Sequence, residues 1–337
     1  MTTAPDRASD RTIRESIPPA REWAKTLLIG LFMGTADGVP GVSGGTIALI
    51  AGIYERLVAA ITAVTPGRFL AGVTALTPLD GGVSIDRALE IWESVDGWFL
   101  ITLLTGILAA VATVTRIVEY ADEHAPIVLF GFFFGLIAAS ALVLLREIAI
   151  DTARTAVAAL AGFLLAFYVS GISDGVLGGG GLPVVFLAGA IAVSAMILPG
   201  ISGSLLLVIM SQYTRMTETL SSFIDGLTGL ATGGSIDAVL GPGRVVVAFV
   251  LGGLVGLFTV ARLIRRALDA DRETTLAFLV ALVVGALRAP VATLNGPEYA
   301  VTWTVQTLWT FGVVAAVGAA VVLVLDWYAV DLDLDAV

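Results

Sequence analysis

Residues 36–56 read ADGVPGVSGGTIALIAGIYER, and residues 195–215 read AMILPGISGSLLLVIMSQYTR. The second stretch repeats the first after 159 residues (195 minus 36). Each interrupts an apolar run with a Pro-Gly-x-Ser-Gly motif, in which proline removes a backbone donor and glycine permits a sharp turn. We therefore expect two copies of a broken helix. The matched pairs are Ala36/Ala195, Pro40/Pro199, Gly41/Gly200, Ser43/Ser202, Gly44/Gly203, Tyr54/Tyr213 and Arg56/Arg215, with Val42 facing Ile201.

The chain as a whole has the composition of an integral membrane protein. Of its 337 residues, 57% are hydrophobic and 14% are charged, whereas soluble domains carry about 25% charged residues. This composition excludes cytosolic enzymes, nucleic-acid binders and disordered chains. With no cysteine and a single histidine, His124, we expect neither a cofactor nor a metal site.

Six uninterrupted apolar stretches are long enough to span a bilayer, at 98–118, 125–146, 153–171, 244–264, 273–290 and 303–325. Two further regions, 26–61 and 184–213, contain the motifs. The eleven residues of 26–36 would cover about 16 Å as a helix, and a bilayer core is about 30 Å thick. We therefore interpret each interrupted region as a re-entrant hairpin of two partial helices.

The duplication extends past the motifs. At a shift of 146 residues, Gly106, Thr113, Val114 and Arg116 match Gly252, Thr259, Val260 and Arg262. Each half then holds one hairpin and three spanning helices, and an odd number of crossings inverts the second copy. The predicted fold is an all-α membrane protein with an inverted repeat. One transmembrane domain covers 26–325, with repeat 1 at about 26–171 and repeat 2 at about 182–325.

The distribution of cations predicts the orientation. With the N-terminus inside, 14 Lys and Arg residues fall in cytoplasmic segments and only Arg116, Arg215, Arg244 and Arg288 fall outside. We expect a multi-pass protein of the cell membrane with both termini in the cytoplasm. Residues 1–25 would form one cytoplasmic tail, without a signal peptide, and the acidic residues 326–337 the other.

The two loops are the predicted binding site. A broken helix leaves backbone N–H groups without partners, and these groups are tolerated in a membrane where they face a polar cavity or a ligand. The positive end of a helix dipole favours an anion at such a place. The alternative is that the loops are hairpin tips packed together through glycine contacts. The candidate binding residues in the loops are Pro40, Gly41, Ser43, Gly44, Gly45, Thr46, Pro199, Gly200, Ser202, Gly203 and Ser204.

Ionisable residues near the loops add further candidates. Asp37 would bind a coupling proton or cation, or cap the following backbone. Arg56 and Arg215 would gather an anionic headgroup on opposite faces, as would Arg288 near the outer end of its helix. Glu55 is a second coupling candidate, and the alternative for Glu55 and Arg56 is an interfacial salt bridge.

Enzymatic readings fail on the residue inventory. Gly41-Val-Ser-Gly44 and Gly200-Ile-Ser-Gly203 have the form of an intramembrane serine protease motif, but that chemistry needs a histidine base. The only histidine falls in a predicted outer loop. We therefore expect no enzymatic activity.

The stretch GTADGVPGVSGGTIALIAGIYER at 34–56, the motif SAMILPGISGS at 194–204 and the FFFGL run at 132–136 resemble the polyprenyl-phosphate transporter family. The resemblance covers about residues 22–325. It implies flipping of a polyprenyl monophosphate from the outer to the cytoplasmic leaflet for reuse, with undecaprenyl phosphate or, in an archaeon, dolichyl phosphate as the carrier. The second copy departs from the first at SQYTR, 211–215, which lacks the acidic residue that Glu55 supplies.

Two other functions stay open. A channel or ion-coupled transporter for a small inorganic anion would use the same loops, and a membrane-embedded enzyme or scaffold for polyprenyl lipids is the third reading. Coupling to protons or sodium is a further hypothesis. The sequence is compatible with a homo-oligomer and does not determine the oligomeric state.

Overall fold

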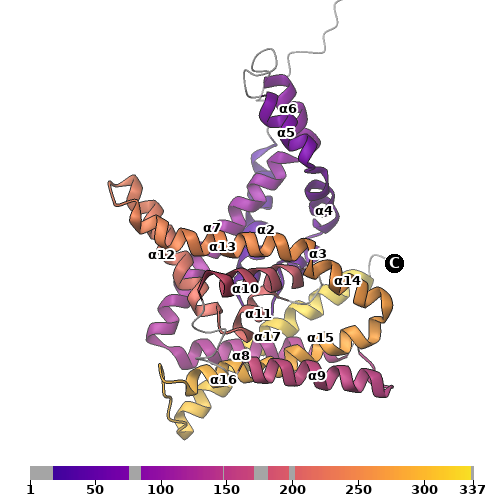
Figure 1. Ribbon diagram of the computed structural model, residues 1–337, viewed down its shortest axis with the longest axis vertical. Helices are drawn as coiled ribbons and strands as arrows, with labels where there is room; N and C mark the ends of the chain where they lie inside the picture. Colours follow the sequence, from indigo (N-terminus) through magenta and orange to yellow (C-terminus); the bar gives the residue numbers. More distant parts are fainter. Residues whose placement is uncertain (1–17, 76–84, 147, 171–180, 197–201, 335–337) are drawn as a thin grey trace, which may run out of the picture. The chain divides into compact units, whose positions relative to one another are not determined.

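A computed structural model describes residues 18–75, 85–146, 148–170, 181–196 and 202–334, and the regular structure within these ranges is helical (Figure 1). Among the described residues, five helices are long and apolar enough to cross a membrane, or six if one bent pair counts as a span. The protein is therefore an all-α, multi-pass membrane protein, which confirms the predicted fold class. The five spans are Gly97–His124, Pro126–Leu145, Asp237–Ala270, Arg272–Asn295 and Val305–Tyr328.

The chain divides into two compact units, of which the first comprises residues 1–34 and 47–110 and the second residues 35–46 and 111–337. Each is described by itself. The helices are α2 Ala20–Gly38, α3 Gly44–Ile50, α4 Tyr54–Ala63, α5 Pro66–Ala75, α6 Ile85–Ser94, α7 Gly97–His124, α8 Pro126–Leu145, α9 Ala153–Val169, α10 Leu182–Ala195, α11 Gly203–Ile209, α12 Tyr213–Ala231, α13 Asp237–Phe258, α14 Val260–Ala270, α15 Arg272–Ala286, α16 Arg288–Asn295 and α17 Val305–Leu334.

Each of the six predicted stretches is helical where the structure describes it. Five of them belong to the spans given above, whereas the stretch at 153–171 forms α9, an apolar helix of 17 residues that is shorter than any of those spans. Parts of both predicted tails are helical, because α2 begins at Ala20 and α17 continues through the acidic residues to Leu334, and the tails themselves stay predictions. The predicted hairpin arm 26–36 is too short, since α2 runs on to Gly38 and places Asp37 in its last turn.

A turn interrupts the second arm of each predicted hairpin, which the sequence analysis did not expect. Helices α3 and α4 meet at an angle of 118°. The turn between them is a Schellman motif, in which Ile53 N donates to Ala48 O and Gly52 N to Leu49 O, at 3.0 and 2.9 Å. Gly52 has a φ of 68°, a left-handed conformation that glycine adopts without a Cβ clash.

The same turn recurs after α11. Gln212 N donates to Leu207 O at 2.8 Å and Ser211 N to Val208 O at 3.0 Å, and Ser211 has a φ of 54°. Each of these residues lies 159 positions after its counterpart in the first turn. The duplication read from the motifs is thus repeated in backbone geometry, while the inversion of the second copy and the repeat boundaries stay predictions.

Helix packing through glycine is duplicated as well. In the first unit, a side chain at Gly30 would collide with the carbonyl of Leu103, where α2 crosses α7. In the second unit, a side chain at Gly189 would collide with the carbonyl of Phe249, where α10 crosses α13. The two contacts are related by the shifts of 159 and 146 residues (189 minus 30; 249 minus 103). Small residues at these crossings let two backbones approach closely, as is usual in membranes.

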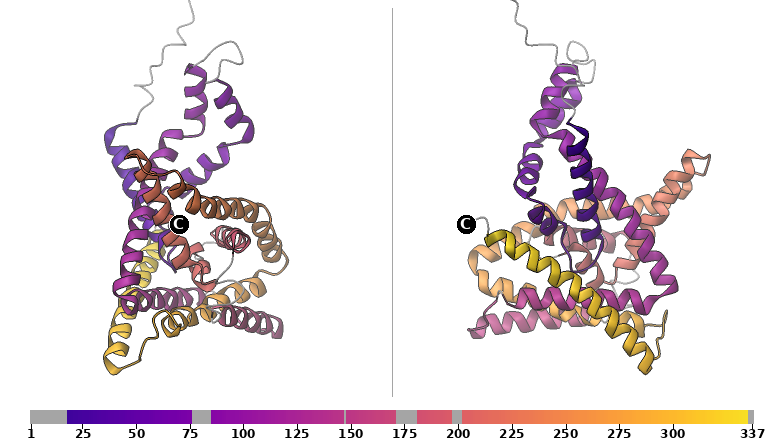
Figure 2. Two further views of the ribbon diagram at one scale, coloured as in Figure 1. Left: turned by 60° about the vertical axis from the view of Figure 1, so that its left-hand side comes forward. Right: turned by 180° about the vertical axis from the view of Figure 1, so that it is seen from behind.

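The core of the second unit lies around α8. Helix α8 packs along α17, and α9 packs along α15 (Figure 2). Phe133, Leu136 and Ile137 of α8 are almost completely buried. This core also includes Leu205 and Ile209 of α11, so the short helix after the second motif is fixed by apolar packing.

Candidate functional site

The first loop is closed on itself by Asp37. Its carboxylate oxygen Oδ1 accepts a hydrogen bond of 2.7 Å from the backbone N–H of Gly44, the first residue of α3. A side chain at Gly44 would collide with this carboxylate. Asp37 therefore places its own negative charge at the start of α3, where the sequence analysis expected a ligand anion, and this contact agrees with the capping role offered as its alternative.

Beside the second loop, the described residues carry no charge at the position equivalent to Asp37. Met196 corresponds to Asp37 and Gly203 to Gly44, and a side chain at Gly203 would meet the thioether of Met196. Ser202 and Ser204, both buried, share a hydrogen bond of 2.6 Å between their hydroxyl groups. Pro199 and Gly200 lie outside the described residues.

Side chains of two helices in the second unit, α8 and α12, donate hydrogen bonds to the first loop. The hydroxyl of Tyr213 donates to the carbonyl of Gly38 at 2.5 Å, and the hydroxyl of Ser140 donates to the carbonyl of Gly41 at 2.5 Å. Gly41 has a φ of 93° and lies against the backbone of Leu136. A larger residue at Gly41 would be strained and crowded. Pro40 is buried nearby, whereas Ser43, Gly45 and Thr46 are partly exposed.

A mostly apolar cavity of about 320 Å³, which we call the loop cavity, lies beside the start of the first loop and the start of α11. Asp37 and Gly38 of the first loop and Gly203 and Ser204 after the second lie on its wall. The structure therefore brings these predicted residues together. The remaining wall comes from α7, α10 and its C-cap, α11, α12 and α13, through Val111, Val114, Thr115, Ala192, Val193, Met196, Leu207, Tyr213, Met216, Thr217, Leu220, Val246, Phe249 and Val250.

A second cavity of about 300 Å³, the Arg215 pocket, has a polar lining. Arg215 lies on its wall with the side chains of Ser211 and Thr214, and Glu218 and Glu298 are its acidic members. Phe130, Val208, Tyr213, Thr293, Gly296 and Pro297 complete the lining.

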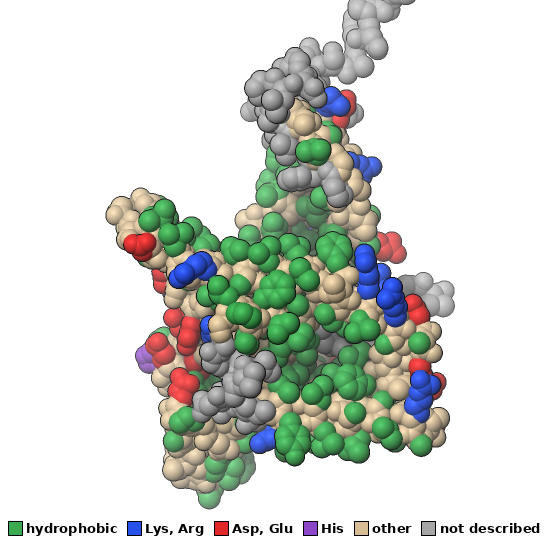
Figure 3. Space-filling model, in the orientation of Figure 1, with side chains coloured by type: hydrophobic (Ala, Val, Ile, Leu, Met, Phe, Trp, Pro, Cys, Tyr) green, Lys and Arg blue, Asp and Glu red, His purple; other side chains and the backbone are tan. Residues whose placement is uncertain are grey.

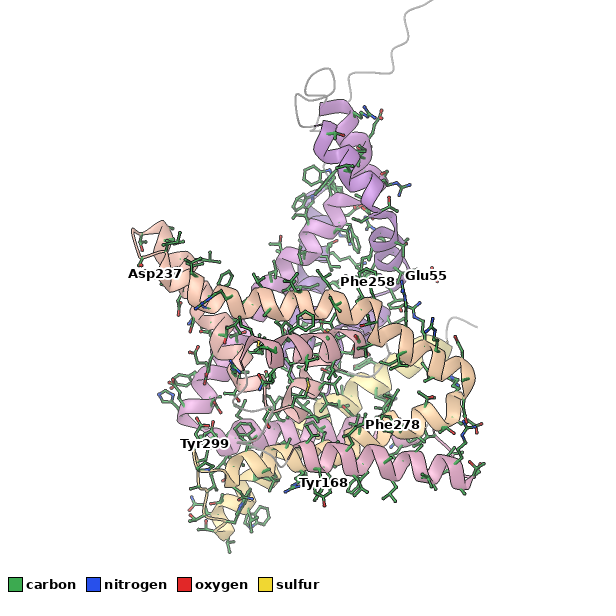
Figure 4. The ribbon with its side chains drawn as sticks, in the orientation of Figure 1. Glu55, Tyr168, Asp237, Phe258, Phe278 and Tyr299 are labelled. Atoms are coloured by element: carbon green, nitrogen blue, oxygen red, sulfur yellow. The ribbon has the colours of Figure 1, made fainter. Side chains whose placement is uncertain are left out.

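The electrostatics of the Arg215 pocket are dominated by carboxylates. Burial raises the pKa of Glu218 above its usual range, and the negative charges nearby raise it further; these belong to Asp122, Glu298, Glu119 and Glu123. Tyr299, between α16 and α17 (Figure 4), donates a hydrogen bond of 2.8 Å to Asp122. Its pKa is raised by burial and by that bond. Protonation of Glu218 thus reduces the negative charge beside Arg215.

The other predicted residues lie elsewhere. Arg56 of the first unit forms an ion pair of 2.6 Å with Asp96 and lies 4.3 Å from the ring centroid of Phe99. Arg56 thus forms a salt bridge with Asp96, whereas an interfacial bridge of the Glu55 and Arg56 pair stays a prediction. Glu55 is exposed in the first turn of α4 (Figure 4).

The sequence analysis expected Arg288 near the outer end of its helix. In the structure α15 ends at Ala286, and Arg288 is the first residue of α16. Its guanidinium donates to the carbonyl of Phe167 at 2.7 Å and lies 4.4 Å from the centroid of the same ring. Because Phe167 is in the last turn of α9, Arg288 donates to a carbonyl at a helix end, which also accepts a hydrogen bond of 3.4 Å from the hydroxyl of Ser170. A headgroup role for Arg288 stays a prediction.

The sequence analysis missed three residues that shape the site. Tyr213 was visible as the partner of Tyr54, but only the structure shows that it is buried, 4% exposed, on the wall of both cavities. Glu218 and Glu298 carry no signal in the sequence, because they are 80 residues apart (298 minus 218) and meet through the fold. Within the described ranges, no group of three His, Asp or Glu residues could hold a metal ion.

The protein is a helical membrane protein with several spans, two copies of a broken helix and cavities beside them. Many membrane transporters bind their substrates at interrupted helices of this kind. Comparison with known proteins gives the family. Residues 33–307 match the undecaprenyl phosphate translocase-like family, and the chain belongs to it.

Two curated relatives bear the name polyprenyl-phosphate transporter. The protein from Vibrio cholerae serotype O1 is 33% identical over 265 residues, which cover 79% of this chain and 76% of the relative. The protein from Staphylococcus aureus is 29% identical over 294 residues, covering 83% and 89% of the two chains. No solved structure is significantly similar to the chain.

Proposed function

We propose that the protein carries a polyprenyl monophosphate lipid across the membrane and binds its phosphate in the Arg215 pocket. The observation that carries the proposal is the position of Arg215, a cation beside the side chains of Ser211 and Thr214 in a polar cavity of a highly apolar protein. A phosphate is bound best by a guanidinium with further donors. The names of the two relatives support this lipid as the substrate.

Glu218 and Glu298 line the same pocket, and their negative charge favours a site that releases its ligand over one that retains it. They compete with the phosphate for Arg215, so the bound lipid is held weakly enough to leave again. Transport requires such a compromise between entry and release. The arrangement supports a transport role without a chemical step.

We further propose a direction and a topology. The excess of cations in the predicted cytoplasmic segments supports cytoplasmic termini in the cell membrane, with movement of the lipid from the outer to the inner leaflet for reuse. Undecaprenyl phosphate or dolichyl phosphate would be the carrier. Asp37 is the candidate for proton or sodium coupling, and gradient-dependent transport that is unchanged in Asp37→Asn would remove that role.

The test is headgroup translocation in proteoliposomes, with a fluorescent polyprenyl phosphate and a quencher in the outer aqueous phase. We expect protein-dependent flipping that Arg215→Ala lowers about 10- to 100-fold and Arg244→Ala preserves. Arg244 is the matched control because it is an exposed arginine on α13 that does not line the pocket. Radiotracer flux of chloride or phosphate in vesicles without polyprenyl lipid, together with an immobile lipid, would instead establish a small-anion transporter.

A further inference from the structure

We infer that the loop cavity binds the hydrocarbon chain of the lipid, at the isoprene units next to the phosphate, and not the headgroup. The inference rests on the proposed function and adds a second subsite to it. The cavity of about 320 Å³ is at the lower end of ligand pockets, which suits a short part of a chain whose remainder stays in the bilayer.

The polar groups on the cavity wall already have partners within the protein. The hydroxyl of Tyr213 donates to Gly38, that of Thr115 to the carbonyl of Val111 at 2.7 Å, and that of Thr217 to the carbonyl of Thr214 at 2.7 Å. Ser204 shares its hydrogen bond with Ser202. Because these donors are engaged, a phosphate that entered the cavity would lose its hydration without new hydrogen bonds.

The charge of the wall also disfavours a phosphate. Asp37 is the ionisable acid among the lining residues, and the lining includes no Arg or Lys. Its carboxylate is held in place by Gly44. An anionic headgroup would face a negative charge without a cation, whereas a hydrocarbon chain would contact the apolar side chains that form most of the wall.

The cavity reaches a surface that is itself apolar. Met196 and Val250 line it and are 41% and 51% exposed, so they lie where the cavity opens. On α13 around that opening, Val247, Leu251 and Leu254 are also exposed. Figure 3 shows hydrophobic side chains gathered over α10 and α13. A mouth of this kind faces lipid tails, so a prenyl chain can enter sideways from the bilayer.

Tyr213 connects the two subsites. It lines both the loop cavity and the Arg215 pocket. A lipid with its phosphate at Arg215 and its chain directed past Tyr213 would place polar and apolar parts in matching surroundings. The phosphate end and the first isoprene units are adjacent in the lipid, as the two cavities are in the protein.

The direct test is photocrosslinking of the full-length protein in nanodiscs. The probe is a polyprenyl phosphate with a diazirine in the isoprene unit next to the phosphate, and phosphatidylcholine with a diazirine in its acyl chain is the control lipid. We expect the polyprenyl probe to label α10, α12 and α13 at the cavity residues. Labelling of exposed surfaces alone, in the pattern of the control lipid, would overturn the inference.

A mouth variant gives an independent readout. Val250→Trp blocks the opening, and Val313→Trp is its control, because Val313 on α17 is about as exposed and does not line the cavity. We expect Val250→Trp to lower transport and cavity labelling about tenfold, corresponding to the loss of contact with a few CH₂ groups, and Val313→Trp to leave both unchanged. Equal transport by both folded variants would contradict the inference.

The outcomes separate the two proposals. If the wild type does not flip polyprenyl phosphate, the proposed function fails. If it flips the lipid but the crosslinks avoid the cavity, only the chain subsite fails. Should Val250→Trp not fold, the labelling pattern of the wild-type protein decides.

Discussion

The two broken helices share a backbone plan and differ in the charges attached to it. In both, the first glycine of the short helix lies against the side chain of the residue seven positions earlier. Both short helices end in the same left-handed turn. In the first copy that earlier residue is Asp37, which binds Gly44; in the second it is Met196, which contacts Gly203 without a hydrogen bond from its side chain. Duplication thus preserved the geometry that the backbone needs, while the chemistry diverged.

The paired arginines differ in the same sense. Arg56 is engaged by Asp96 and Phe99 next to its own helix, whereas Arg215 lines a polar cavity. In the first copy the arginine makes structural contacts, and in the second copy we propose that the arginine binds the phosphate. Equivalent positions in a duplicated transporter need not share one task.

The largest expected effect is at the arginines. Arg215→Ala should lower the transport rate about 10- to 100-fold, since hydrogen bonds to a charged group contribute about 1.5–3 kcal/mol. Arg56→Ala should change transport little and lower the free energy of unfolding by about 1 kcal/mol, because an exposed ion pair and a cation–π contact are weak. Flipping assays and thermal unfolding of both variants measure the difference, and Arg215→Lys tests whether charge alone suffices. Equal losses of transport at Arg56 and Arg215 would contradict a division of labour between the copies.

The next effect concerns the cap. Asp37→Ala should lower the free energy of unfolding by about 1 kcal/mol, because the N–H of Gly44 loses its acceptor, as when a helix cap is removed. Asp37→Asn keeps an acceptor oxygen and should lose less. Met196→Ala has no cap to lose and serves as the control from the second copy. Thermal unfolding in the same detergent measures all three, and an uncapped Asp37→Ala as stable as the wild type would show that the bond to Gly44 contributes nothing.

A smaller effect is expected at the duplicated turn. Gly52→Ala should lower stability by about 1 kcal/mol, since a Cβ is disfavoured in the left-handed conformation. Ser211→Gly should raise stability by up to about 1 kcal/mol at the equivalent position, where a side chain now occupies that conformation. If thermal unfolding shows that Gly52→Ala lowers stability and Ser211→Gly raises it, the same backbone turn is used twice. Stability changes of the same sign in both variants would refute this.

The smallest effect is a dependence on pH. Because the pKa of Glu218 is raised, this carboxyl gains a proton, as pH falls, earlier than a free glutamate does, and the Arg215 pocket becomes less negative. Binding of the phosphate should therefore strengthen about two- to fivefold as pH falls through that pKa, an effect of about 0.5–1 kcal/mol. Glu218→Gln should remove this dependence.

Binding of a polyprenyl phosphate between pH 5 and 8 measures the effect, with Glu273→Gln as the control from an exposed position outside the pocket. The phosphate itself titrates with a second pKa near about 6 in all variants, so only the difference from Glu218→Gln reports on the protein. An unchanged pH profile in that variant would assign the whole effect to the lipid.

Much of the fold was readable from the sequence because its signals are local. Apolar stretches predicted the five spans and the shorter apolar helix α9, and the Pro-Gly-x-Ser-Gly motifs predicted both breaks. The second break in each hairpin was missed although Gly52 marks it, because Ser211 occupies the same turn without a glycine to show it. Of the predicted site, Asp37, Gly203 and Ser204 meet at one cavity, and Arg215 lines the other.

The sequence by itself determined that this is a helical membrane protein with a duplicated broken helix, since hydrophobic length and turn residues act over short distances. Only the tertiary structure decided which copy presents a cation to a polar cavity. Arg215 and Glu218 meet Glu298 there, and Tyr213 reaches Gly38 from 175 positions away. Such contacts depend on how distant helices pack, and a single sequence does not specify that packing residue by residue.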